Sequence, residues 1–175
     1  MRFCTLATIM LLASLAAVPA ASGADPEVEQ FLSEEFGGDV PSPSQIWLVG
    51  ERSKEAARIL GHPYKTKRVR YWQREGKRVF VLDEIGKERP ITAGFVVAGG
   101  RLQRVAVLIF RESRGGEVRR ESFTRQFEDA ALDERRFLDR RIDGISGATL
   151  SVGAIERLAR LALWLATESE DKPSG

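Results

Sequence analysis

The chain of 175 residues has very little cysteine and very little histidine. Its one cysteine, Cys4, lies in an apolar N-terminal run, and its one histidine is His62. If that run is removed, the protein has no disulfide, no thiol nucleophile, no cysteine-ligated iron–sulfur cluster and no c-type haem. A single histidine also excludes a multi-histidine metal site. Redox chemistry in such a protein would therefore need an organic cofactor.

The chain also lacks an excess of charge of either sign. It has 27 Lys and Arg residues against 25 Asp and Glu residues, and the N-terminal run contains only Arg2 among them. Nine arginines between Arg111 and Asp143 are matched by nine acids, which indicates a solvated, salt-bridged surface. This balance gives no support for binding to nucleic acid or to an anionic membrane.

Residues 1–24 have the pattern of a secretory signal peptide. The apolar run from Phe3 to Val18 is followed by small residues, of which Ser22 and Ala24 fit the small-x-small cleavage rule. We therefore expect an exported, periplasmic chain that begins at Asp25 and has the size of one domain. The run is shorter than the ~20 residues of a spanning helix, so an uncleaved membrane anchor is the less favoured alternative.

Residues 25–66 are predicted to be an N-terminal helical segment of the domain. Apolar residues recur at helical spacing over residues 25–36 and again over 53–60, and glycines end both runs. An extended connector with two prolines, residues 40–44, lies between them. His62 follows the second helix and is interpreted as a loop or cap residue, not as a base or ligand.

The middle of the chain is predicted to form strands. Two turn signals, Glu75-Gly76 and Gly99-Gly100, each separate a pair of apolar or alternating runs. Successive hairpins favour an antiparallel sheet. The four predicted strands cover residues 68–74, 77–83, 91–98 and 102–110.

The last of these strands is apolar on both faces. Alternation places Val105, Val107 and Ile109 on one face, and the residues between them, together with Phe110, on the other. A strand of this kind is typical of the centre of a sheet that helices cover on both sides.

The rest of the chain is predicted to be mainly helical. Phe123 and Phe127 suggest a short helix, residues 135–138 another turn, and residues 152–167 a long amphipathic helix before a polar, disordered tail over 168–175. The sequence therefore predicts a single α+β domain, in which helices pack on an antiparallel sheet of hairpins.

The stretch just before the long helix has the features of an anion site. It combines an acid, two glycines and three hydroxyls: Asp143-Gly144-Ile145-Ser146-Gly147-Ala148-Thr149-Leu150-Ser151. Small residues allow close approach to the backbone, and a helix start offers free N–H groups to a phosphate. The stretch has neither a P-loop lysine nor a G-x-S-x-G elbow. A simple helix start with Thr149 or Ser151 as its cap is the structural alternative.

Asp143-Gly144-Ile145-Ser146-Gly147-Ala148-Thr149 resembles the D-G-x-[ST]-G-A-T motif of the FMN-binding domain family. That family includes the covalent-flavin domains of the sodium-pumping NADH:quinone reductase and of the related Rnf electron-transport complex. Glu112-Ser113-Arg114-Gly115 resembles the family's E-T-P-G segment, with serine for threonine and arginine for proline. The resemblance implies that residues 67–167 form an FMN-binding domain.

The resemblance implies that FMN is joined to Thr149 by a phosphodiester bond. A separate Mg²⁺-dependent flavin transferase would attach it from FAD, because a threonine hydroxyl is a poor nucleophile. Gly144, Gly147 and Ala148 would let the flavin lie close, and Ser146 and Ser151 would bond its phosphate. Asp143 would tie down the turn or contact the transferase, and Glu112 and Gly115 would contact the flavin.

The expected function is electron transfer between partner proteins, or to a quinone-type acceptor, without catalytic side chains of its own. The partners would be the flavin transferase and a redox protein or membrane electron-transport complex. A flavin-dependent reductase of a small substrate is one alternative. A non-redox binding module that has lost the flavin is the other.

Overall fold

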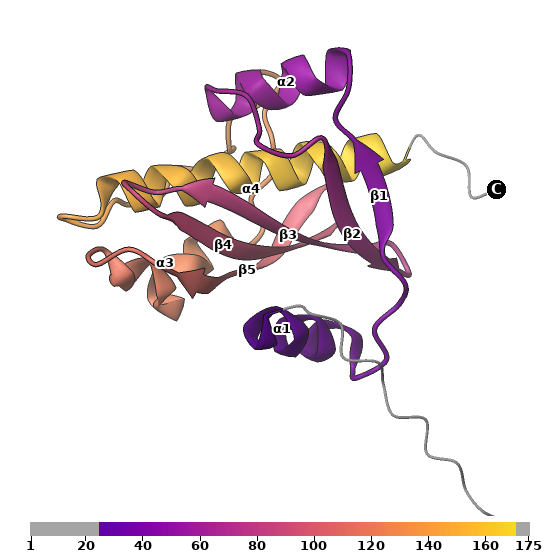
Figure 1. Ribbon diagram of the computed structural model, residues 1–175, viewed down its shortest axis with the longest axis horizontal. Coiled ribbons are helices and arrows are strands. Elements are labelled where there is room, and N and C mark those ends of the chain that lie inside the picture. The colour runs from indigo at the N-terminus through magenta and orange to yellow at the C-terminus, as the bar shows by residue number, and fades with distance from the viewer. Residues whose placement is uncertain (1–24, 171–175) are drawn as a thin grey trace, which may run out of the picture.

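The computed structural model describes residues 25–170 and shows one α+β unit (Figure 1). Residues 1–24, where a signal peptide is predicted, and residues 171–175 lie outside the described part. The helices are α1 (Pro26–Phe36), α2 (Glu51–Leu60), α3 (Glu121–Thr124) and α4 (Thr149–Glu170), with short 3-10 turns η1 (Gly116–Arg119) and η2 (Arg125–Phe127). The strands are β1 (Ser44–Trp47), β2 (Arg68–Arg74), β3 (Lys77–Ile85), β4 (Pro90–Ala98) and β5 (Arg101–Phe110).

The five strands form one antiparallel sheet in the order of the sequence, β1-β2-β3-β4-β5. The predicted sheet of hairpins is confirmed, and both predicted turns, Glu75-Gly76 and Gly99-Gly100, lie between the strands that they were predicted to join. β1 was not predicted. It lies within residues 25–66 and pairs with β2 through Ile46 and Val69, so the N-terminal segment is part of the sheet.

Helices cover both faces of the sheet. In Figure 1, α4 crosses one face of the sheet and α1 lies against the other. The α4 side holds the larger core, in which Phe80, Phe95 and Ile155 are fully buried. The α1 side holds a smaller cluster built from three α1 residues and four strand residues: Phe31, Leu32, Phe36, Trp72, Val79, Val96 and Leu108.

β5 is an edge strand, so its predicted central position is wrong. Its two apolar faces are explained by the helices above and below the sheet and not by a strand on either side. The outer edge is closed where the strand begins: Leu102 N–H donates to Ala130 O at 2.9 Å, and Asp129 N–H donates to Leu102 O at 2.7 Å. These bonds protect part of an edge that would otherwise be open to pairing.

A register shift in β5 also corrects the predicted faces. Ala93 pairs with Val107 and Thr92 with Ile109, so Leu108 is an extra residue. Val105 and Val107 pack on the α4 side as expected, but Ile109 packs in the α1 cluster, because the extra residue inverts the alternation. The bulge therefore reverses which residues of the end of β5 face α1 and which face α4.

The chain between β5 and α4 contains less helix than predicted. Residues 135–138 form a turn that ends in a bridge between Leu132 and Leu138. α4 in turn is longer than the predicted 152–167, because it starts at Thr149 and continues to Glu170. Its last turns include buried Ser169, so the first residues of the predicted disordered tail are helical.

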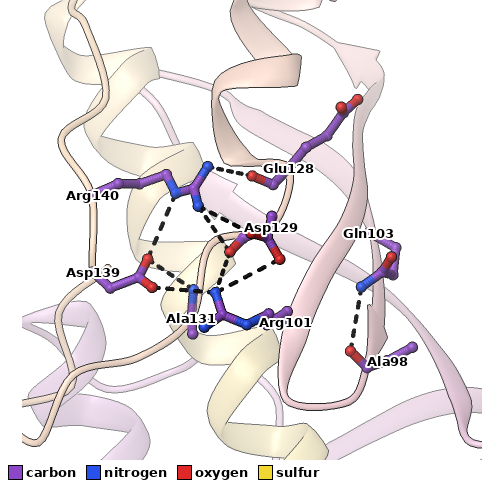
Figure 2. A network of polar contacts seen from close by, with 8 residues as sticks. All are labelled: Ala98, Arg101, Gln103, Glu128, Asp129, Ala131, Asp139 and Arg140. Atoms are coloured by element: carbon purple, nitrogen blue, oxygen red, sulfur yellow. Dashed lines mark hydrogen bonds and ion pairs between the residues drawn. The ribbon is translucent and has the colours of Figure 1, made fainter.

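Ion pairs hold this connecting segment against the start of β5 (Figure 2). Arg101 donates to Asp129 O at 2.7 Å and lies 3.5 Å from an Asp139 carboxylate oxygen. Arg140 donates to the carbonyl oxygens of Glu128 and Asp129. The Ala131 N–H bond to Asp139 is the main cause that lowers the pKa of that carboxyl. The salt-bridged surface predicted for this region is thus present.

Gly94 in β4 leaves the space that α1 needs. A Cβ added there would lie 2.6 Å from Cζ of Phe31, a buried ring in the α1 cluster. We predict that Gly94→Ala lowers the free energy of unfolding by about 1–3 kcal/mol through overpacking. Denaturant unfolding measures it. Gly144→Ala is the control, because its Cβ would meet nothing within 4 Å, and an equal loss in both variants would contradict the explanation.

Candidate functional site

The motif of residues 143–149 forms the turn that leads into α4. Ala148 N–H donates to Ile145 O at 3.0 Å, which closes a turn through Ser146 and Gly147. Gly147 has a φ of +81°, a left-handed conformation that favours glycine. Gly144 has no such φ, and a Cβ there would meet open space. Of the two motif glycines, the backbone therefore requires only Gly147.

Thr149 is the first residue of α4, and it is exposed. Ser146 is exposed as well, whereas Ala148 and Ser151 are buried. The first helical bond runs from Val152 N–H to Ala148 O at 2.9 Å, so three N–H groups, of residues 149–151, precede it. An exposed hydroxyl thus lies at a helix terminus that favours negative charge.

The structure brings the two segments of the family resemblance together. A Cβ added to Gly115 would lie 3.2 Å from both Ala148 Cβ and Ser151 Oγ, so the loop after β5 lies directly against the start of α4. Gly115 also has a φ of +85°. Residues 116–142 separate the segments along the chain, and only the fold brings them into contact.

A cavity of about 530 Å³ opens beside this contact. Ser146 and Gly147 line one side, and residues 113–117 and Arg120 line the other. Arg114 and Arg120 give the cavity two guanidinium groups, against one acid, Glu117. An electropositive wall next to free helix N–H groups suits a phosphate or another anion.

Sequence reasoning missed two residues here. Arg120 enters the cavity because η1 turns the chain back toward the motif, and no local pattern signals that return. Gln126 anchors the start of the motif: its Oε1 accepts the Asp143 N–H at 2.7 Å. The motif is therefore held at one end by η2, through the backbone of Asp143, and continues at the other end into α4. Asp143 itself is exposed.

Glu112 has a structural role that the resemblance did not suggest. Its Oε1 accepts three backbone N–H groups of the β3–β4 loop, from Lys87 at 2.6 Å, Glu88 at 2.7 Å and Arg89 at 2.9 Å. These bonds, with that from Arg89 the strongest cause, lower the pKa of the carboxyl. The carboxylate thus ties the end of β5 to the neighbouring hairpin, and neither Glu112 nor residues 87–89 are among those that line the cavity.

His62 lies at a different place in the fold. Its Nε2 is 3.0 Å from Oε1 of Glu84, a buried residue of β3, and its Nδ1 is 3.1 Å from Pro63 O. These two residues line a separate cavity of about 150 Å³. This position agrees with the prediction of a loop residue after α2.

Comparison of the sequence with known proteins does not assign the chain to a family. The chain matches no protein-family model and no curated protein sequence. Within residues 25–170, no helix is both long enough and apolar enough to cross a membrane.

The Glu112 anchor gives a pH-dependent prediction. Because the pKa of Glu112 is lowered in the fold, the carboxylate accepts these hydrogen bonds at any pH above that pKa. The bonds are lost as the pH falls through it. Glu112→Gln should therefore speed hydrogen exchange at the amides of residues 87–89 at neutral pH and weaken the acid dependence of their protection. Glu117→Gln, at an exposed acid of the cavity, is the control. Equal protection in both variants would contradict the anchor.

Proposed function

We propose that the protein is an exported flavoprotein that carries FMN covalently on Thr149. The observation that supports this best is the contact of Gly115 with Ala148 and Ser151. It joins the two segments that resemble the FMN-binding domain family at one cavity, next to an exposed threonine at the start of a helix.

The residues present fit such a group. The left-handed Gly147 and the close approach at Gly115 leave room beside the backbone. The N–H groups that begin α4, the Ser146 hydroxyl and the guanidinium groups of Arg114 and Arg120 could together hold a phosphate. Ser151 is buried against Gly115, so its hydroxyl would support the loop more directly than the phosphate.

Attachment would need a second enzyme. Thr149 offers an exposed hydroxyl, and His62, the one histidine, is engaged with Glu84 elsewhere in the fold. A Mg²⁺-dependent flavin transferase would supply the base that takes the Thr149 proton, and AMP would leave from FAD as the phosphodiester bond forms. The exposed turn around Ser146 and Gly147 is open to such an enzyme.

The proposed task is to pass electrons between partner proteins or to a quinone-type acceptor outside the cytoplasm. Bound FMN would supply reversible electron transfer, which side chains lack. The chain's own residues would hold the flavin in place, and Arg114 and Arg120 would favour negative charge beside it. A covalent bond would keep the cofactor from diffusing away after export.

Intact mass spectrometry tests the attachment. The protein is co-expressed with a flavin transferase in an exporting host, and the expected product is yellow and heavier by one FMN less water. Thr149→Val keeps a branched side chain but lacks the hydroxyl, so it should lose the added mass. Thr66→Val, at another exposed threonine, should keep it. An added mass that survives in Thr149→Val, or is absent from the parent protein, would overturn the proposal.

A further inference from the structure

Another cavity, of about 310 Å³, lies on the α1 side of the sheet. Val28 of α1, Trp72 of β2 and Val81 of β3 line it, and all three belong to or pack on the α1 cluster. Arg68, Arg70 and Arg111 line it as well. The cavity therefore combines an apolar wall with three guanidinium groups.

Two of these arginines have no acidic partner among the residues that the structure describes. Arg68 and Arg70 share a face of β2 with Trp72, because strand residues two apart point the same way. Within residues 25–170, neither guanidinium group forms an ion pair or a hydrogen bond. Uncompensated arginines that line a cavity attract a carboxylate, which a guanidinium fork can bind through two bonds.

The third arginine is fixed in position. Arg111 Nη1 donates to Thr92 Oγ1 at 3.0 Å and to Pro90 O at 3.3 Å. Thr92 is buried, and its hydroxyl donates to Asp83 Oδ1 at 2.5 Å. This chain of bonds orients Arg111 in the absence of any ligand, so binding would not need to order it.

The two acids at the cavity are already engaged. Asp83 accepts the Thr92 hydroxyl and lies 3.8 Å from Lys65 Nζ, and Asp25 lies 3.9 Å from Arg111 Nη2. Burial raises the pKa of the Tyr64 hydroxyl at the same wall, so Tyr64 stays neutral and can donate a hydrogen bond. The charge left over for a ligand is positive.

We infer that this cavity is a binding site for a small organic acid. Its carboxylate would pair with Arg68 and Arg70, and its apolar body would lie against Trp72 and Val81. The volume is at the lower end of the range for small-molecule sites, about 300–1,000 Å³. The site is independent of the proposed flavin, although Arg111 directly precedes the loop of residues 112–115.

Calorimetry with phthalate as the probe tests the inference on the exported protein. Phthalate should bind saturably, with one site per chain, and about tenfold more tightly than inorganic phosphate, which lacks an apolar body. The double variant Arg68→Gln, Arg70→Gln should weaken phthalate binding at least about tenfold. Arg58→Gln removes one positive charge from the exposed face of α2 and should leave phthalate binding unchanged.

A spectroscopic measurement locates the ligand without relying on the arginine variants. In a ¹H–¹⁵N spectrum, phthalate should shift the indole N–H resonance of Trp72, assigned with Trp72→Phe, and leave in place that of Trp164, which is buried in the core on the α4 side. Absence of saturable binding, equal affinity for phosphate, or a Trp72 resonance that does not move would each overturn the inference. So would unchanged affinity in a folded arginine double variant.

Discussion

The packing of α4 on the sheet is the interaction on which the rest of the molecule depends. Its inner stripe, which includes Ile155, Leu158 and Leu161, is completely buried against the strands. Burial of such side chains contributes roughly 1.5–3 kcal/mol each before entropy is counted. Because this stripe fixes the axis and rotation of α4, it also fixes the first turn, where Thr149 is exposed and Ala148 meets Gly115.

Much of the fold could be predicted because its signals are local. Alternating apolar residues, glycines at turns and a broad apolar stripe predict four of the strands and the long helix. The errors concern long-range order. The position of a strand in a sheet depends on which other strands pair with it, and the strand's own sequence does not contain that information. The two apolar faces of β5 therefore suggested a central strand, although it lies at the edge. No local pattern signals that Leu108 is an extra residue in the ladder, and this bulge moves Ile109 to the opposite face of the sheet.

The candidate site divides in the same way. The turn, the helix start and Thr149 belong to one continuous stretch of sequence. The attachment of a flavin to Thr149 remains a prediction. The contact with Gly115 was implied by family resemblance alone, since spacing along the chain carries no information about it. Arg120 and Gln126 are contributed by the irregular segment after β5, whose path is set by tertiary contacts.

The connectivity of the sheet has a consequence for the order in which the molecule is assembled. Every strand pairs with its neighbour in sequence, and short turns join β2, β3, β4 and β5, so this part of the meander can form early. The cavity beside Gly115 is different, because one of its sides, formed by Ser146 and Gly147, is the turn that leads directly into α4. Any nascent or truncated chain that ends before α4 would contain the residues of all five strands but would lack Thr149 and Ser151. The site is thus expected to form only after α4 is present, and the proposed transferase would act only on chains that already include this helix.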